Sequence, residues 1–376
     1  MNHKNNPNFD FYSFGEPPKA EPMTEKTTPT DAWNADSHED LAPMLDTAAL
    51  HRTTALSYSR IGLALAVAIV LWFALSAVVI VIGAAISPSL GSNLMFSTLA
   101  GTLPLYIICT PLLYMIISGL PTARPAPKKL SLSHILMLFL MAQGLMWAGN
   151  FIGEGLMGVM GRLTGVDYYN QLNDTVGLPI WFTALLTGIL APVFEELIFR
   201  KLMLDRMLPY GEGQAILIGG LLFGLFHGNF YQFFYAASLG MLLSFVYAKT
   251  GKWHYTVLLH IAINFTGGIL PAILLQKIDY ERYLALDPAN LEEMEAFMAE
   301  YGPQMTAISL YSAAQIVMGL AGIVLLILSF KKIKANTRPS LLPFGTGMKA
   351  ALLNGGMLCA IFVCALLIVA QLLPIA

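Results

Sequence analysis

Long apolar segments recur through most of the chain and constrain its fold more than any other feature. A transmembrane helix needs about 20 apolar residues. Six segments have this length: residues 61–86, 94–117, 132–157, 180–204, 306–330 and 350–373. Polar breaks at Gly228-Asn229 and Lys249–His254 divide the intervening region into three further helices, at about 214–228, 230–248 and 255–275. The pattern predicts an all-α polytopic membrane protein, a bundle of about eight to nine transmembrane helices.

Composition supports this class. Of the 376 residues, 56% are hydrophobic and 12% are charged, whereas charged residues make up about 25% of a soluble domain. Residues 1–57 differ from the rest, because Asn, Pro, Thr, Asp and Glu dominate their first 46 positions without apolar periodicity. We therefore predict a disordered polar tail over 1–57 and a multi-span transmembrane domain over 58–376.

Basic residues indicate the topology. With nine spans and a cytoplasmic N-terminus, each basic cluster falls on the inner side, after the second, fourth, sixth and eighth spans, as the positive-inside rule requires. We expect a multi-pass protein of a bacterial cell membrane. The acidic loop 279–300 then lies outside, and residues 289–301 are predicted to form a short surface helix capped by Asp287 or Asn290.

Two acids and an arginine interrupt the fourth span, where charged side chains are costly and usually functional. They are Glu195, Glu196 and Arg200. Residues four apart share one face of a helix, so Glu196 and Arg200 are predicted to form an ion pair. Glu195 points to another face, and we therefore predict it to be the reactive acid.

Two further polar interruptions follow at the same spacing. Phe223 and His227 share one helix face, and His260 and Asn264 share another. At 1.5 Å per residue, Glu195 and Asn264 both lie roughly 15 Å from the cytoplasmic boundary, and His227 lies near 20 Å. The sequence thus predicts a central polar cavity inside the membrane. Asn229 and Gln232 follow His227, and a polar helix break explains them as well as a substrate contact does.

These side chains suit peptide hydrolysis by an activated water. Glu195 can take a proton from water and His227 can relay it. His260 and Asn264 can donate hydrogen bonds to the developing oxyanion. The expected partners are a membrane peptide or protein substrate and the lipid bilayer, with no role for nucleic acid.

A metal-dependent version of this site stays open. His227, His260 and Glu195 could bind Zn²⁺ as a two-histidine, one-carboxylate site with an open position for water. The zinc-protease signature HExxH is absent from the sequence. The favoured interpretation needs no cofactor, and Zn²⁺ is the alternative.

The three motifs, in this order, resemble those of the CAAX prenyl endopeptidase and bacteriocin-processing (CPBP, or Abi) family of intramembrane proteases. The motif residues here are Glu195, Glu196 and Arg200, then Phe223 and His227, then His260 and Asn264. The resemblance covers a core at about 180–272. It implies that Glu195 and His227 activate water, that His260 and Asn264 form the oxyanion hole, and that the activity is a glutamate-type or metal-dependent endopeptidase. Two rival functions are a non-catalytic bacteriocin-immunity or scaffold protein and a proton-coupled transporter.

Overall fold

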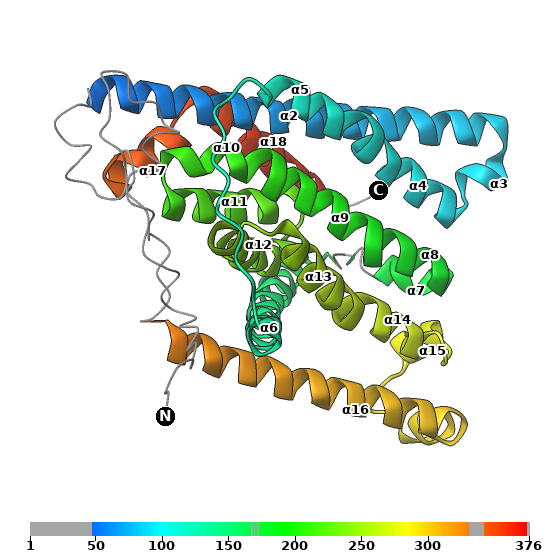
Figure 1. Cartoon of the computed structure of the whole chain (residues 1–376). Helices are drawn as coiled ribbons and strands as arrows, with labels where there is room; N and C mark the ends of the chain where they lie inside the picture. Colours follow the sequence, from blue (N-terminus) through cyan, green and yellow to red (C-terminus); the bar gives the residue numbers. More distant parts are fainter. Residues whose placement is uncertain (1–46, 167, 169, 171–172, 331–341, 374–376) are drawn as a thin grey trace, which may run out of the picture.

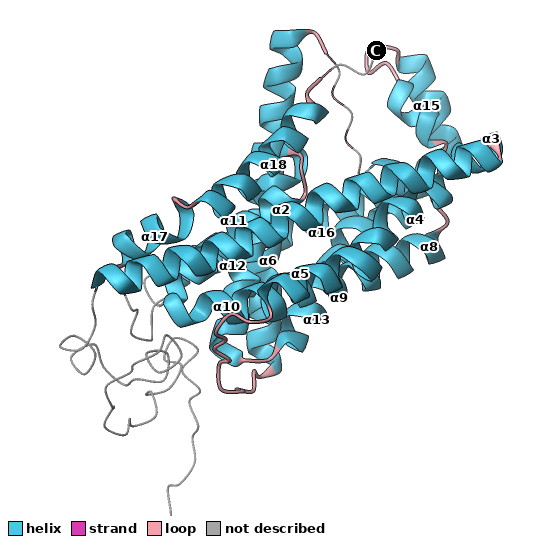
Figure 2. Cartoon of the chain, turned by 90° about the horizontal axis from the view of Figure 1, so that it is seen from above, coloured by secondary structure: helices cyan, strands magenta, loops and turns pink. Residues whose placement is uncertain are grey.

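The computed structural model describes residues 47–166, 168, 170, 173–330 and 342–373. Over these residues the regular structure is entirely helical, which confirms the predicted all-α bundle (Figure 2). Of the predicted tail, residues 1–46 lie outside the described residues. Residues 47–57, which the composition assigned to the tail, form the first turns of a long helix instead.

Seven helical segments in the described residues are long and apolar enough to cross a membrane. They are Thr47–Ile86 (α2), Leu94–Ile117, Leu132–Thr164 (α6), Ile180–Tyr210, Phe230–Thr250 (α12), Trp253–Leu275 and Leu291–Ser329 (α16). The shorter helices are Pro88–Gly91 (α3), Asp174–Gly177 (α7), Glu212–Phe226 (α11), Tyr280–Ala285 (α15), Phe344–Leu352 (α17) and Gly355–Gln371 (α18). In Figure 1, α2 runs along one side of the bundle and α16 along the opposite side, with α11 and α12 between them.

Three of the nine predicted spans differ in form from the prediction. The segment predicted at 214–228 is α11, which has 15 residues and is shorter than a span. The segment predicted at 350–373 bends by 66° between α17 and α18. The predicted surface helix 289–301 and the span 306–330 are one continuous helix, α16, capped by the Asn290 side chain.

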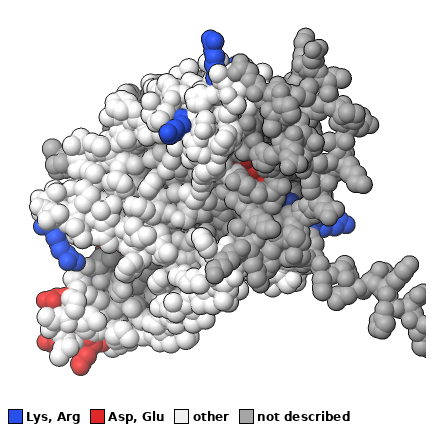
Figure 3. Space-filling model, turned by 90° about the vertical axis from the view of Figure 1, so that its left-hand side faces the viewer, with Lys and Arg blue, Asp and Glu red and all other residues white. Residues whose placement is uncertain are grey.

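Small residues let the helices approach closely around α6, which packs against both α12 and α16. A Cβ at Gly149 would lie 2.4 Å from the backbone of Tyr235 in α12, and one at Gly144 would lie 2.6 Å from the backbone of Ile323 in α16. On the face drawn in Figure 3, few charged side chains interrupt the described surface. A face with so few charged side chains suits a lipid environment.

Proline shapes three of the spans. In each of these spans a wide π-helical turn precedes a proline: Leu105–Cys109 (η1), Leu186–Leu190 (η3) and Phe265–Ile269 (η6). A proline follows each of these turns at its second position: Pro111, Pro192 and Pro271. Proline has no N–H and its ring clashes with the carbonyl four residues earlier in an α-helix. The wider turn accommodates the ring, and the helix continues beyond it.

The spans that carry η3 and η6 also carry five of the seven motif residues, and Phe223 and His227 belong to α11 and its C-terminal end. The parts of these two spans are Ile180–Leu185 (α8), η3, Ala191–Glu196 (α9), Leu197–Leu204 (η4), Asp205–Met207 (α10) and Leu208–Tyr210 (η5), and then Trp253–Asn264 (α13), η6 and Leu270–Leu275 (α14). Glu195 and Glu196 end α9, directly before the π-helical segment η4. Asn264 ends α13, directly before η6.

Candidate active site

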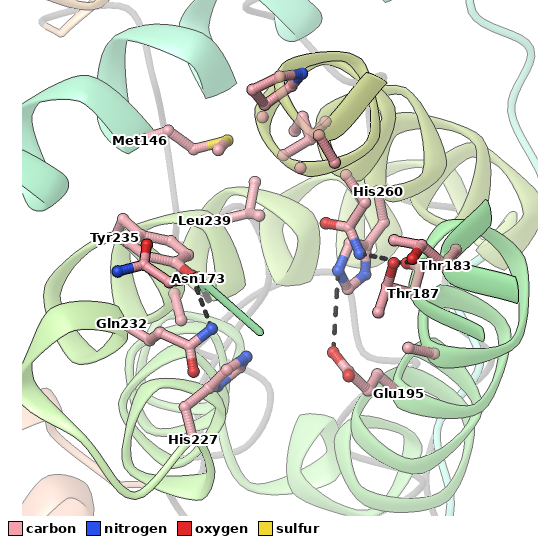
Figure 4. A pocket seen from close by; sticks show the side chains of 18 of the residues that line it. Met146, Asn173, Thr183, Thr187, Glu195, His227, Gln232, Tyr235, Leu239 and His260 are labelled. Atoms are coloured by element: carbon pink, nitrogen blue, oxygen red, sulfur yellow. Dashed lines mark hydrogen bonds and ion pairs between the residues drawn. The ribbon is translucent and has the colours of Figure 1, made fainter. Parts of the chain in front are cut away.

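A cavity of about 360 Å³ lies between these two spans and the α11–α12 pair. Five of the predicted motif residues line it: Glu195, Phe223, His227, His260 and Asn264. Figure 4 shows Glu195 and His260 on one side of the hollow. His227, Gln232 and Tyr235 lie on the other side. The structure therefore brings the motif side chains of three separate helical segments to one space, and α12 adds Gln232 and Tyr235.

Glu196 and Arg200 lie behind the cavity wall. Both side chains are fully buried, and Arg200 Nε lies 2.9 Å from Glu196 Oε2 while its Nη2 donates to Oε1 at 3.1 Å. The guanidinium also lies 5.0 Å from the centre of the Phe223 ring. The predicted ion pair is thus present, and it allows two charges to be buried together.

His260 bridges the two glutamates. Its Nδ1 lies 3.1 Å from Glu196 Oε1, and its Nε2 lies 3.8 Å from Glu195 Oε2. The Glu195 side chain is 16% exposed, whereas that of Glu196 is fully buried. Both ring nitrogens of His260 therefore face carboxylates, which differs from the predicted arrangement in which this ring points at a substrate oxygen.

His227 has a defined orientation at the end of α11. Its Nδ1 lies 2.8 Å from the carbonyl oxygen of Phe223. A carbonyl oxygen can only accept a hydrogen bond, so Nδ1 is the donor in this pair. In the neutral imidazole the other nitrogen, Nε2, then carries a lone pair and can accept a proton. The Phe223 ring packs edge-on against His227, with ring centres 5.1 Å apart.

Asn264 depends on the proline-widened turn in the neighbouring span. Its Nδ2 donates to the carbonyl oxygen of Thr187 at 2.8 Å. In a π-helical turn the N–H five residues later would use that oxygen, but residue 192 is a proline and has none. The missing backbone donor thus leaves the Thr187 carbonyl to Asn264. One amide hydrogen of Asn264 is used in this contact, and the second is left for the cavity.

The same arrangement recurs behind η6. Pro271 leaves the carbonyl oxygen of Thr266 without its backbone donor, and Tyr311 and Gln315 of α16 donate to it at 2.6 and 2.7 Å. Both π-helical turns beside the cavity therefore present a carbonyl to a side chain from another helix.

A metal ion is a poor fit to this set of donors. In the described part of the chain, no group of three or more His, Cys, Asp or Glu side chains is placed so that it could hold a metal. The set considered from the sequence was Glu195, His227 and His260, and these three side chains do not form such a group in the structure. We therefore derive no chemical step through a metal.

Several polar lining residues were not predicted as site residues. Asn173, Thr183, Thr187 and Tyr235 line the cavity, and Gln232 was left open between a helix break and a substrate contact. Gln232 and Tyr235 follow His227 by five and eight residues, which no common motif marks. Their position depends on where α12 begins, and that boundary is set by the Asn229 cap.

Comparisons with known proteins point to the same region. The family model described as type II CAAX prenyl endopeptidase Rce1-like matches residues 177–266. A curated relative, UPF0177 protein YxdF of Lactococcus lactis subsp. lactis (strain IL1403), is 29% identical over 108 residues, or 28% of this chain. The chain spans 60% of the length of this relative. No solved structure matches the chain. The family match contains all seven motif residues and confirms that residues 177–266 are similar to the CPBP family of intramembrane proteases.

Proposed function

We propose that this chain is an intramembrane endopeptidase of the CAAX type, which hydrolyses a peptide bond in a membrane-associated or lipid-modified peptide. One observation carries the proposal: Glu195 and the Nε2 side of His227 border the same cavity inside a bundle of membrane-spanning helices. The similarity of residues 177–266 to the type II CAAX prenyl endopeptidases supports it.

In the proposed reaction, one water molecule binds between Glu195 and His227. Glu195 takes a proton from this water while the water oxygen attacks the carbonyl carbon of the substrate. His227 Nε2 accepts a hydrogen bond from the other hydrogen of the same water, so Glu195 holds the transferred proton. The proton then passes to the leaving amine as the carbon–nitrogen bond breaks. This route needs no nucleophilic side chain, because water supplies the attacking oxygen.

The remaining motif residues orient these groups. His260, held by the buried Glu196–Arg200 pair, faces Glu195 and restricts its carboxylate to the cavity side. We assign oxyanion stabilisation to the second amide hydrogen of Asn264. This changes the role predicted for His260 from an oxyanion donor to a group that positions the base.

The cavity also suits an apolar substrate. Apolar side chains line it beside the polar groups, among them Met146, Leu239, Ile263, Pro271 and Leu275. A lipid-modified or membrane-embedded peptide could bury its own apolar groups there, which is favourable at about 25 cal/mol per Å² of apolar surface. We further infer a cytoplasmic N-terminus from the basic clusters and the positive-inside rule, and the similarity to a Lactococcus lactis protein supports a bacterial cell membrane.

Cleavage assays with Glu195→Gln and His227→Ala test this proposal. The probes are an internally quenched peptide that ends in a farnesylated cysteine followed by three apolar residues, and the same peptide without farnesyl. The full chain in lipid nanodiscs should cleave at least one probe. Each variant should lower kcat by about 100- to 10,000-fold at unchanged protein yield, the usual contribution of general acid–base catalysis. Glu154→Gln is the matched control, because Glu154 binds Asn170 outside the cavity at 3.1 Å and should keep full activity.

The same assay tests the alternatives. Chelator treatment and added Zn²⁺ should each leave the rate unchanged, because the proposed route uses no metal. A chelator-sensitive rate restored by Zn²⁺ would contradict that route. Saturable binding without cleavage of either probe would favour the scaffold function, and full activity of Glu195→Gln would refute the assigned base.

A further inference from the structure

Two polar side chains outside the three motifs face the cavity from α12. Gln232 and Tyr235 are half-buried and line the cavity on the side opposite Glu195 (Figure 4). The proposed hydrolysis gives neither of them a role. Their hydrogen bonds form a chain that begins at the backbone of His227.

Asn229 is the fixed end of this chain. Its Oδ1 accepts from the backbone N–H of Gln232 at 2.8 Å, and its Nδ2 donates to the carbonyl oxygen of His227 at 2.8 Å. A backbone N–H can only donate and a carbonyl can only accept. These two contacts therefore leave the Asn229 amide with one orientation.

The orientation of Asn229 determines that of Gln232. Asn229 Nδ2 also donates to Gln232 Oε1 at 2.8 Å, so the Gln232 oxygen is an acceptor and its Nε2 is left to donate. That Nε2 donates to the Tyr235 hydroxyl oxygen at 2.9 Å.

Tyr235 is the open end of the chain. Its hydroxyl oxygen accepts from Gln232, so its hydrogen must be donated elsewhere. None of the hydrogen bonds among the described residues gives that hydrogen an acceptor. Because Tyr235 lines the cavity, a bound molecule can supply one.

We propose that the Tyr235 hydroxyl donates a hydrogen bond to a backbone carbonyl of the bound peptide substrate, and that Gln232 and Asn229 hold it in the donor state. A backbone carbonyl is the acceptor that each residue of a peptide offers. Tyr235 thus binds the peptide from the wall opposite Glu195, and Gln232 and Asn229 are positioning residues. This inference rests on the proposed function only in that the substrate is a peptide bound in this cavity.

Binding to an inactive protein tests the inference separately from cleavage. The farnesylated probe peptide, labelled with a fluorophore, is titrated onto Glu195→Gln and onto Glu195→Gln with Tyr235→Phe, both as full chains in nanodiscs. Loss of the hydroxyl should weaken binding and raise the Kd about three- to tenfold, the usual net effect of one hydrogen bond. In the active protein, the same substitution should raise KM by a similar factor.

Tyr231→Phe is the matched control in the same helix. The Tyr231 hydroxyl donates to the carbonyl oxygen of Tyr168 at 2.6 Å and does not line the cavity. Its removal should leave the Kd within twofold. A Tyr235→Phe effect below twofold, or the absence of saturable probe binding, would overturn the inference.

Gln232→Glu reverses the polarity of the chain. The new carboxylate accepts hydrogen bonds only, so it takes the Tyr235 hydrogen away from the substrate. This variant should weaken the Kd at least as much as Tyr235→Phe, and adding Tyr235→Phe to it should have no further effect. An unchanged Kd in Gln232→Glu would contradict the inference.

The two proposals can fail separately. If the wild-type chain cleaves neither probe but the Kd still depends on Tyr235, the peptide site stands and the hydrolase proposal fails. If cleavage depends on Glu195 but Tyr235→Phe leaves the Kd unchanged, the hydrolase proposal stands and the proposed role of Tyr235 fails.

Discussion

The two walls of the cavity are built in different ways. The wall that carries Glu195 and Asn264 consists of two spans with proline-widened turns, and its backbone carbonyls bind side chains from neighbouring helices. The wall that carries His227 and Tyr235 consists of regular α-helix, and its polar groups are held by the side chain of Asn229. The first wall is fixed by backbone defects and buried charge, and the second by a helix cap. The first should therefore be the more sensitive to substitution.

Glu196→Gln should have the largest effect in this comparison. It leaves Arg200 charged and fully buried without its partner, which typically destabilises a protein by about 3–5 kcal/mol. We expect a marked loss of folded protein, measured by yield and by thermal unfolding in detergent.

The double substitution Glu196→Gln with Arg200→Met separates folding from activity. Without the buried charge, folding should largely recover, while activity stays low because His260 has lost the carboxylate at its Nδ1. Full activity in the double variant would show that this wall needs no buried charge.

Pro192→Ala should have the next largest effect. The new backbone N–H can compete with Asn264 for the Thr187 carbonyl or restore a regular α-helical turn, and either displaces the Asn264 amide. We expect kcat to fall about 10- to 100-fold in the peptide assay, consistent with a displaced oxyanion donor, while the Tm is unchanged or higher.

Pro111→Ala is the matched control for Pro192→Ala. It follows the same kind of turn, η1, in a span that does not line the cavity. Its activity should stay within twofold of the wild type. Equal losses in both proline variants would mean that the effect is general to the bundle.

Asn229→Ala should have the smallest effect. The loss of an N-cap costs about 1 kcal/mol, and the orientation of Gln232 is lost with it. We expect a modest fall in Tm and a several-fold rise in KM for the probe peptide.

Asn354→Ala removes the same kind of cap, since Asn354 accepts from the backbone N–H of Met357 at the start of α18. Its Tm should fall by a similar amount with KM unchanged. If both cap variants raise KM, the effect is not specific to Asn229.

The sequence predicted contacts within a helix better than contacts between helices. The Glu196–Arg200 pair and the Phe223–His227 contact both follow from a spacing of four residues. The contact of His260 with both glutamates could not be predicted, because it depends on how two separate spans pack.

Helix irregularities account for other differences. The partner of Asn264 is Thr187, whose carbonyl is available only because Pro192 follows a π-helical turn, and a regular helix had been assumed. The continuity of α16 was also missed, because residues 291–301 are acidic and the following residues are apolar. The change in composition predicts a break, although the helix continues through it and through Pro303.

The length of α11 has a consequence for where the chain reverses. Fifteen residues rise about 22 Å, which is less than the roughly 30 Å of a hydrocarbon core. Glu212 at the start of α11 pairs with Lys249 near the end of α12 at 2.7 Å, so these two ends lie at one level. The hairpin at residues 227–229 ends both helices beside the cavity, and the backbone groups left free at the two helix ends need other partners. Side chains such as Asn229 bind those groups. The closure of this hairpin therefore also places polar side chains beside the cavity.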